Sequence, residues 1–184
     1  MARTGWSYQL SLLAIFSALA FLASLFVKIT LSYGAIVYSI VLLTGALLMA
    51  RPFSATAIAA ISGLIYSFQS QLFLLMLGTF LVRGLALDLI FIPARVYERA
   101  SAGSYSVPMI AAAMVTSGFL AGLYQYFFIT LFLGKLIDFG AFLVSTIFLT
   151  SLVSNAIASY IVPRLLMPRL RGVWGGAPEA AAQG

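Results

Sequence analysis

The 184-residue sequence contains no cysteine, no histidine and only four acidic residues. Without cysteine, the chain forms no disulfide, no thiolate metal site and no cysteine nucleophile. Without histidine, it lacks the commonest general base and the commonest metal ligand. Four carboxylates leave little material for a paired-carboxylate active site. These absences argue against most classes of enzyme, so we expect a protein that is not an enzyme and uses no metal and no cofactor.

Charged residues are also scarce, because they make up 8% of the chain while hydrophobic residues make up 63%. A soluble domain carries roughly 25% charged residues and about 45–50% apolar ones. The composition therefore predicts a membrane protein, and the length is sufficient for one domain.

Six apolar runs, separated by short polar breaks, follow one another along the chain. A helix that crosses about 30 Å of hydrocarbon needs about 20 mostly apolar residues. We therefore predict an all-α fold, a polytopic membrane protein in which six transmembrane helices form a bundle. The third run is short, so the alternative is five spans with a re-entrant segment. The runs cover residues 9–29, 33–50, 53–68, 72–92, 106–133 and 139–162.

The most polar connection, residues 93–104, is predicted to be a solvated loop, with a short helical turn as the alternative. Residues 1–171 are then expected to form a single six-helix transmembrane domain. The last stretch of the sequence, residues 172–184, is rich in alanine and glycine and has little to bury. We expect it to be a flexible cytoplasmic tail.

Basic residues are distributed unevenly between the two sets of connections. If the N-terminus is cytoplasmic, seven of them lie inside and two, Lys28 and Lys135, lie outside. Cytoplasmic loops are enriched in lysine and arginine, so the sequence predicts a multi-pass protein of the cell membrane with both termini cytoplasmic. The arginines are spread over separate loops rather than clustered with aromatic residues, which argues against a nucleic-acid partner. The inside residues are Arg3, Arg51, Arg95, Arg99, Arg164, Arg169 and Arg171.

Small residues recur four positions apart in three of the predicted helices. Such pairs let helix backbones approach closely in lipid. They serve either packing within this chain or, for the first helix, docking of a partner membrane protein. The pairs are Ala14 with Ala18, Ala59 with Gly63, and Gly118 with Gly122.

Two charged residues, Arg83 and Asp88, lie inside the fourth apolar run. A charge at mid-membrane costs about 2.5–3.5 kcal/mol on insertion scales, so it should face protein or water. The spacing of the two residues corresponds to a rotation of about 140° on a helix, which is poor geometry for a pair. Asn155 lies at comparable depth in the sixth run and is an alternative partner for Arg83. The arginine is either a contact for an anionic substrate, a coupling switch or part of a polar clamp between helices.

The connections that the charge rule places outside combine tyrosines with amide side chains. Tyrosine is common at membrane interfaces, whereas Gln125 lies inside an apolar run, where its amide needs partners. Aromatic walls with a few placed amides suit a small planar ligand, so we predict a pocket for an aromatic heterocycle. The group consists of Tyr33, Tyr66, Gln69, Gln71, Tyr124, Gln125, Tyr126 and Lys135.

The segment 12–21, LLAIFSALAF, resembles the first helix of the substrate-binding S components of energy-coupling factor (ECF) vitamin transporters. Ala14 and Ala18 match the Ala-x-x-x-Ala motif by which that family packs on a transmembrane T component. The family is also similar to this chain in size, in its six helices and in its cytoplasmic termini.

The resemblance implies capture of a vitamin or vitamin precursor at the outer face, docking on the T component and uptake driven by two cytoplasmic ATPases. The chain contains no Walker motif, which agrees with ATP being handled by a partner. Its first outer loop, residues 28–33, is shorter than the loop that often covers the ligand in that family. The family's ligand site, built from outer loops and the outer ends of helices four to six, corresponds here to Gln69, Gln71, Tyr124, Gln125, Lys135 and Asp138.

The sequence therefore predicts the substrate-binding subunit of an ECF-type importer. A thiamine-type pyrimidine, a flavin or another vitamin each fits as its ligand, and the sequence does not choose among them. The alternative is a non-catalytic structural or accessory subunit of a membrane protein complex. Such a subunit would use the small-residue faces equally well and would bind no ligand.

Overall fold

The computed structural model describes residues 6–30 and 34–174, and all regular elements within these ranges are helical. The prediction of an all-α protein is confirmed for this part of the chain. The predicted ligand residue Tyr33 lies outside the described residues, as does the predicted tail beyond residue 174. The elements are α1 Trp6–Ile29, α2 Ala35–Met49, α3 Ser54–Ser67, α4 Phe73–Phe91, α5 Val96–Ser101, α6 Val107–Phe127, η1 Phe128–Phe132, α7 Phe139–Leu143, α8 Thr146–Ile161, η2 Val162–Leu166 and α9 Met167–Trp174.

Four stretches within the described ranges are long and apolar enough to cross a membrane, which indicates a membrane protein. They are Trp6–Val27, Phe73–Phe91, Val107–Phe132 and Phe139–Leu170. Helices α2 and α3 are shorter, with 15 and 14 residues. At about 1.5 Å per residue each is roughly 21–23 Å long, less than the hydrocarbon core of about 30 Å.

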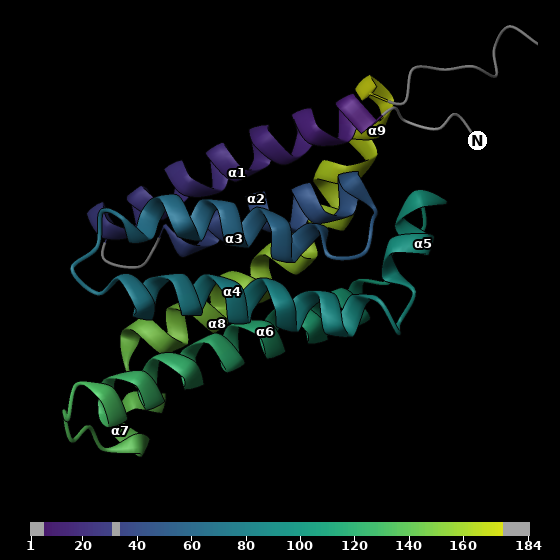
Figure 1. The fold of residues 1–184 in the computed structure, drawn as a ribbon. Helices are drawn as coiled ribbons and strands as arrows, with labels where there is room; N and C mark the ends of the chain where they lie inside the picture. The colour runs from purple at the N-terminus through teal and green to yellow at the C-terminus, as the bar shows by residue number, and fades with distance from the viewer. Residues whose placement is uncertain (1–5, 31–33, 175–184) are drawn as a thin grey trace, which may run out of the picture.

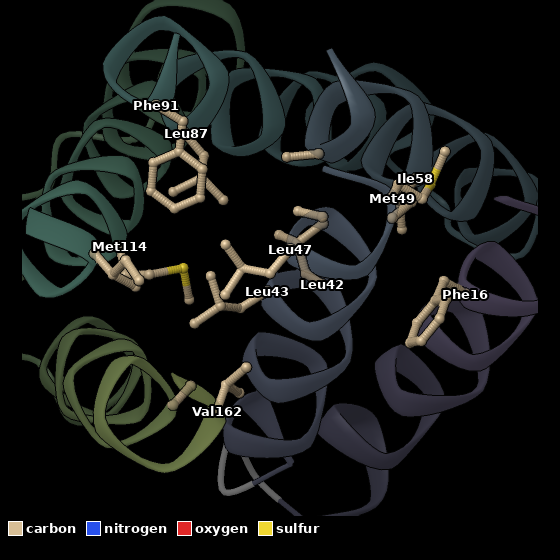
Figure 2. Close-up of a cluster of buried hydrophobic side chains, with 14 of the residues drawn as sticks. Phe16, Leu42, Leu43, Leu47, Met49, Ile58, Leu87, Phe91, Met114 and Val162 are labelled. Carbon is tan, nitrogen blue, oxygen red and sulfur yellow. The ribbon is translucent and has the colours of Figure 1, made fainter. Parts of the chain in front are cut away.

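Helix α2 lies at the centre of the bundle and is buried on almost every side. It packs against α1, α3 and α8 along its length and touches α5 near its end. Figure 2 shows Leu42, Leu43 and Leu47 of α2 pointing into the space between Phe16 of α1 and Met114 of α6. The sequence of α2 is apolar on every face rather than on one side, as is typical of a helix that is surrounded by other helices.

Two of the three small-residue pairs mediate packing within the chain. A Cβ added at Gly63 would lie 2.5 Å from Phe80 Cβ of α4, and Ala59 lies against Gly84 of the same helix. On α6, a Cβ added at Gly118 would lie 2.0 Å from Asn155 Nδ2 of α8, and Gly122 meets a ring of α8 in the same way. These contacts are the close helix approaches that small residues permit.

The third pair has a different setting, because Ala14 and Ala18 are exposed on the face of α1 that points away from α2 and α3. In Figure 1, α1 (purple) forms one margin of the bundle. The opposite face of α1 is covered and contributes Leu12, Phe16 and Ala20 to the core.

The structure corrects two expectations about the connections. Residues 93–104 are not simply a solvated loop, because they contain helix α5, whose Val96, Tyr97 and Ala100 are buried. The sixth apolar run is divided into α7 and α8, since the chain bends at Val144 and Ser145. Ser145 then caps α8 by accepting a hydrogen bond from the Phe148 amide at 3.3 Å.

The two ends of the bundle differ in charge. The start of α1, helix α5 and helix α9 lie at one end, called the α5 end here, and α7 lies at the opposite α7 end (Figure 1). Exposed arginines gather at the α5 end. At the α7 end, the exposed basic residue among those that the structure describes is Lys135. The arginines are Arg51, Arg95, Arg99, Arg164 and Arg169.

Candidate functional site

A cavity of about 230 Å³ lies within the half of the bundle nearer the α7 end. It is formed by the last turns of α1 and α3, the first turns of α2 and α8, the first three turns of α4, the last three turns of α6, and α7. The lining residues are Ser24, Val27, Ala35, Tyr38, Tyr66, Met76, Thr79, Phe80, Arg83, Gly118, Ala121, Gly122, Gln125, Phe142, Phe148 and Ser151.

Aromatic rings make up much of the cavity wall. The Phe80 ring contacts Tyr38 edge-to-face at 5.2 Å between centroids and Tyr66 at 5.5 Å. On the other side, Phe142 and Phe148 lie 5.2 Å apart. Glycine is required behind two of these rings, because a Cβ at Gly63 or Gly122 would collide with Phe80 or Phe148 respectively. The wall therefore offers flat apolar surfaces of the kind that stack on a planar ligand.

Arg83 is the charged residue of this cavity and is only 9% exposed. Its Nη2 donates to Ser39 Oγ at 2.7 Å and also to Asn155 Oδ1. Ser39 in turn donates to Asn155 Oδ1 at 2.8 Å. The guanidinium lies 4.9 Å from the centre of the Tyr38 ring, a cation–π contact. The contact expected between Arg83 and Asn155 is thus present, and it joins α2, α4 and α8.

Asp88 does not pair with Arg83 and serves a separate cluster near the α5 end. It is fully buried and accepts hydrogen bonds from the Thr56 amide at 2.6 Å, the Thr56 hydroxyl at 2.5 Å and the Tyr97 hydroxyl. The Thr56 amide belongs to the first turn of α3, where helix amides lack intrahelical acceptors and favour a negative charge. Burial, followed by the neighbouring Asp88 carboxylate, raises the pKa of Tyr97 well above its usual range. Tyr97 therefore stays protonated and holds α5 against α3 and α4.

Two of the sequence-predicted ligand residues, Tyr66 and Gln125, line the cavity. None of the other described ligand candidates lines the cavity, and three of them have local tasks. The Tyr124 hydroxyl donates to the Leu74 carbonyl at 3.0 Å, and the Tyr126 hydroxyl donates to the Ile137 carbonyl at 3.2 Å. Asp138 caps α7 by accepting from the Ala141 amide at 2.8 Å. The side chains of Gln69, Gln71 and Lys135 are exposed outside the cavity.

Sequence reasoning did not identify the lining residues of α4 and α6 as a set, although a signal was present. Arg83 shares one helix face with three preceding residues at helical spacing, Met76, Thr79 and Phe80. Gln125 shares a face with Gly118, Ala121 and Gly122 in the same register. Side chains three and four positions apart lie on one side of a helix. The positions of Arg83 and Gln125 were therefore enough to predict which other residues of α4 and α6 share their faces.

The lining combines one buried cation, hydroxyl and amide groups, and aromatic rings, which together can bind a small molecule. Among the described residues, no group of three histidine, cysteine, aspartate or glutamate side chains is placed to hold a metal ion. Comparison of the chain with models of protein families, with curated proteins and with solved structures finds no match.

Proposed function

We propose that this protein is the substrate-binding subunit of an ECF-type importer and that it captures a vitamin or vitamin precursor. The observation that carries the proposal is the pairing of two features. A cavity with aromatic walls lies near one end of the bundle, and a small-residue face of α1 is left uncovered on its side. Capture and docking are the two tasks of such a subunit.

The α1 face supports docking because the chain's other small-residue pairs are already occupied. Gly63 and Gly118 lie against side chains of neighbouring helices, whereas Ala14 and Ala18 have no such neighbour among the described residues. Larger apolar residues flank the pair, with Ile15 47% exposed and Leu22 50% exposed. A partner helix with its own small residues would approach this face closely.

The charge distribution supports an orientation in which the α5 end faces the cytoplasm. Exposed arginines gather at that end, and cytoplasmic loops favour such residues. In this orientation six helices cross the membrane. Four of them are long, and α2 and α3 are short spans. The cavity then lies toward the outer face, from which an importer collects its ligand.

The composition of the wall supports a planar ligand. Rings of Tyr38, Tyr66 and Phe80 on one side, and of Phe142 and Phe148 on the other, are suited to stacking on a pyrimidine or another aromatic heterocycle. Thr79 and Gln125 supply polar groups that orient such a ligand. A volume of about 230 Å³ equals that of roughly seven or eight water molecules, so a small molecule fits better than a large cofactor.

The proposal is tested with variants of the α1 docking face, made in the tagged full-length chain and purified from the membranes of its own organism. We expect the wild type to co-purify with a membrane T component and two ATPases, and native mass spectrometry of the protein in detergent to detect a retained small molecule. Ala14→Trp and Ala18→Trp should lose the protein partners while keeping the small molecule. Val153→Trp, on the exposed face of α8, is the matched control and should keep both.

Three results would count against the proposal. If the protein partners still co-purify with both tryptophan variants, the face of α1 at Ala14 and Ala18 is not the docking face. A large complex without ATPases, together with no retained small molecule, would instead identify an accessory subunit. Loss of the partners in Val153→Trp as well would show that the effect of tryptophan is not specific to α1.

A further inference from the structure

We propose that Arg83 is the ligand-binding cation of the cavity and that the ligand is a small ring compound with one carboxylate group. This inference rests on the proposed function and names its substrate class. It assigns the arginine a role in recognition, whereas the sequence alone favoured a polar clamp between helices.

The first argument is the charge balance around the cavity. A guanidinium that is buried inside the membrane-embedded part of a protein normally pairs with an acidic group. The chain has four acidic residues, and the three that are described are engaged elsewhere: Asp88 with Thr56 and Tyr97, Glu98 in an exposed pair with Arg95, and Asp138 at the start of α7. The acceptors that contact Arg83, Ser39 and Asn155, are neutral. Within the described residues, its positive charge is therefore uncompensated.

The second argument is the unused hydrogen-bonding capacity at the same place. Among the described residues, Arg83 is hydrogen-bonded through Nη2, while its buried Nε–H has no partner. Asn155 likewise has an unpaired donor. Its Oδ1 accepts two hydrogen bonds, whereas its buried Nδ2 has no partner. Buried donors are normally satisfied, so these two unpaired donors show that the chain leaves hydrogen-bonding capacity unused at and next to the cavity-lining Arg83.

The third argument is that the arginine is held in place although no described acidic side chain pairs with it. Ser39 and Asn155 fix one nitrogen, and Tyr38 supports the plane of the guanidinium from its face. Gly118 makes room for the Asn155 amide, since a Cβ there would lie 2.0 Å from Nδ2. A positioned arginine of this kind loses little side-chain freedom when it binds an anion.

The number of charges selects the type of anion. One arginine compensates the single charge of a carboxylate, whereas a phosphate ester carries about 1.5 to 2 negative charges at pH 7. Among the described residues that line the cavity, Arg83 is the one cation. The aromatic wall next to Arg83, including Phe80 one helical turn before it, provides the surface for a ring attached to the carboxylate.

The experiment compares an acid with its uncharged isostere on the purified full-length protein in detergent, freed of retained small molecules by washing. Benzoate and benzamide have the same ring and nearly the same shape but differ in charge. Their binding is measured by isothermal titration and by the shift of the thermal unfolding midpoint up to millimolar concentrations. We expect benzoate to bind at least about tenfold more tightly than benzamide, because hydrogen bonds to a charged partner are the stronger ones.

Variants then assign the effect to Arg83. Arg83→Gln should lose the preference for benzoate, and Arg83→Lys should retain part of it because the charge remains. Arg169→Gln, an exposed arginine outside the cavity, should bind as the wild type does. The comparison of benzoate with benzamide on the wild type stands even if an Arg83 variant fails to fold.

Equal binding of benzoate and benzamide by the wild type, or no binding of either, would overturn the proposal. So would an undiminished preference for benzoate in folded Arg83→Gln. None of these results would affect the docking experiment on Ala14 and Ala18, so the subunit's function survives failure of the carboxylate assignment. Conversely, a clear benzoate preference in a chain that binds no T component would uphold the site and refute the importer.

Discussion

The Asp88 cluster offers the sharpest test of how the α5 end is held together. In Asp88→Ala, the Thr56 amide, the Thr56 hydroxyl and the Tyr97 hydroxyl all lose their acceptor. Each buried donor left unpaired costs about 1–3 kcal/mol, and neighbouring losses do not add fully. We therefore expect the free energy of unfolding to fall by about 3–5 kcal/mol, toward the upper end of what single substitutions do.

The expected loss corresponds to a decrease of roughly 6–20 °C in the unfolding midpoint for a chain of this size. It should have a local signature as well, because Asp88 bonds through Tyr97 to α5. Trypsin should cleave after Arg95 and Arg99 faster in Asp88→Ala than in the wild type, since α5 is released from its packing. Thermal unfolding in detergent and a time course of limited proteolysis measure the two effects.

Two control variants separate this cause from others. Asp88→Asn keeps the shape and one acceptor oxygen, so its loss should be smaller. Glu98→Ala removes an exposed partner of Arg95 and should leave the midpoint unchanged, because surface ion pairs contribute little. If Asp88→Ala unfolds within about 2 °C of the wild type, with unchanged proteolysis, the cluster does not hold α5 and our reasoning is wrong.

Two further predictions concern the same contacts and the cavity. The pKa of Tyr97 is raised in the folded state, so stability from its protonated hydroxyl is complete below the unfolded-state pKa of about 10 and is lost as pH rises above it. Between about pH 9 and 11, the unfolding midpoint of the wild type should therefore fall more steeply than that of Tyr97→Phe, and parallel curves would contradict this. Gly118→Ala should destabilise the protein by about 1–3 kcal/mol in thermal unfolding despite the better helix propensity of alanine, because the new Cβ displaces the Asn155 amide. Gly140→Ala, where the nearest atom to the new Cβ is Asp138 Oδ1 at 3.2 Å, is its control and should be nearly neutral; equal effects of the two substitutions would contradict the role of Gly118.

Sequence reasoning located most helices well because apolar runs and their polar breaks are local signals. The run 72–92 and the observed Phe73–Phe91 differ by one residue at each end. It was less successful where burial depends on distant residues. The polar composition of 93–104 favoured a solvated loop over the alternative of a short helical turn, whereas the structure has helix α5, held by contacts of Val96 and Tyr97 with other elements. The uninterrupted apolar run 139–162 concealed the bend before α8, because hydropathy does not report on backbone direction.

The candidate site shows the same division. The sequence indicated the contact between Arg83 and Asn155, since polar groups inside apolar helices must find one another. It did not separate Gln125, which lines the cavity, from Tyr124, whose hydroxyl bonds to the backbone of α4. Adjacent residues on a helix point about 100° apart, so only the rotation of α6 against its neighbours decides which of them faces the cavity.

By itself, the sequence determined that the chain is helical and apolar enough for a membrane, that its arginines favour one end, and that Arg83 requires polar neighbours. Tertiary structure decided that Ala59, Gly63, Gly118 and Gly122 are covered within the chain, whereas Ala14 and Ala18 are exposed. It also decided that Asp88 is engaged away from Arg83. The physical reason is that lipid is as apolar as the core, so hydropathy does not distinguish an inward face from an outward one, and only packing assigns each face its partner.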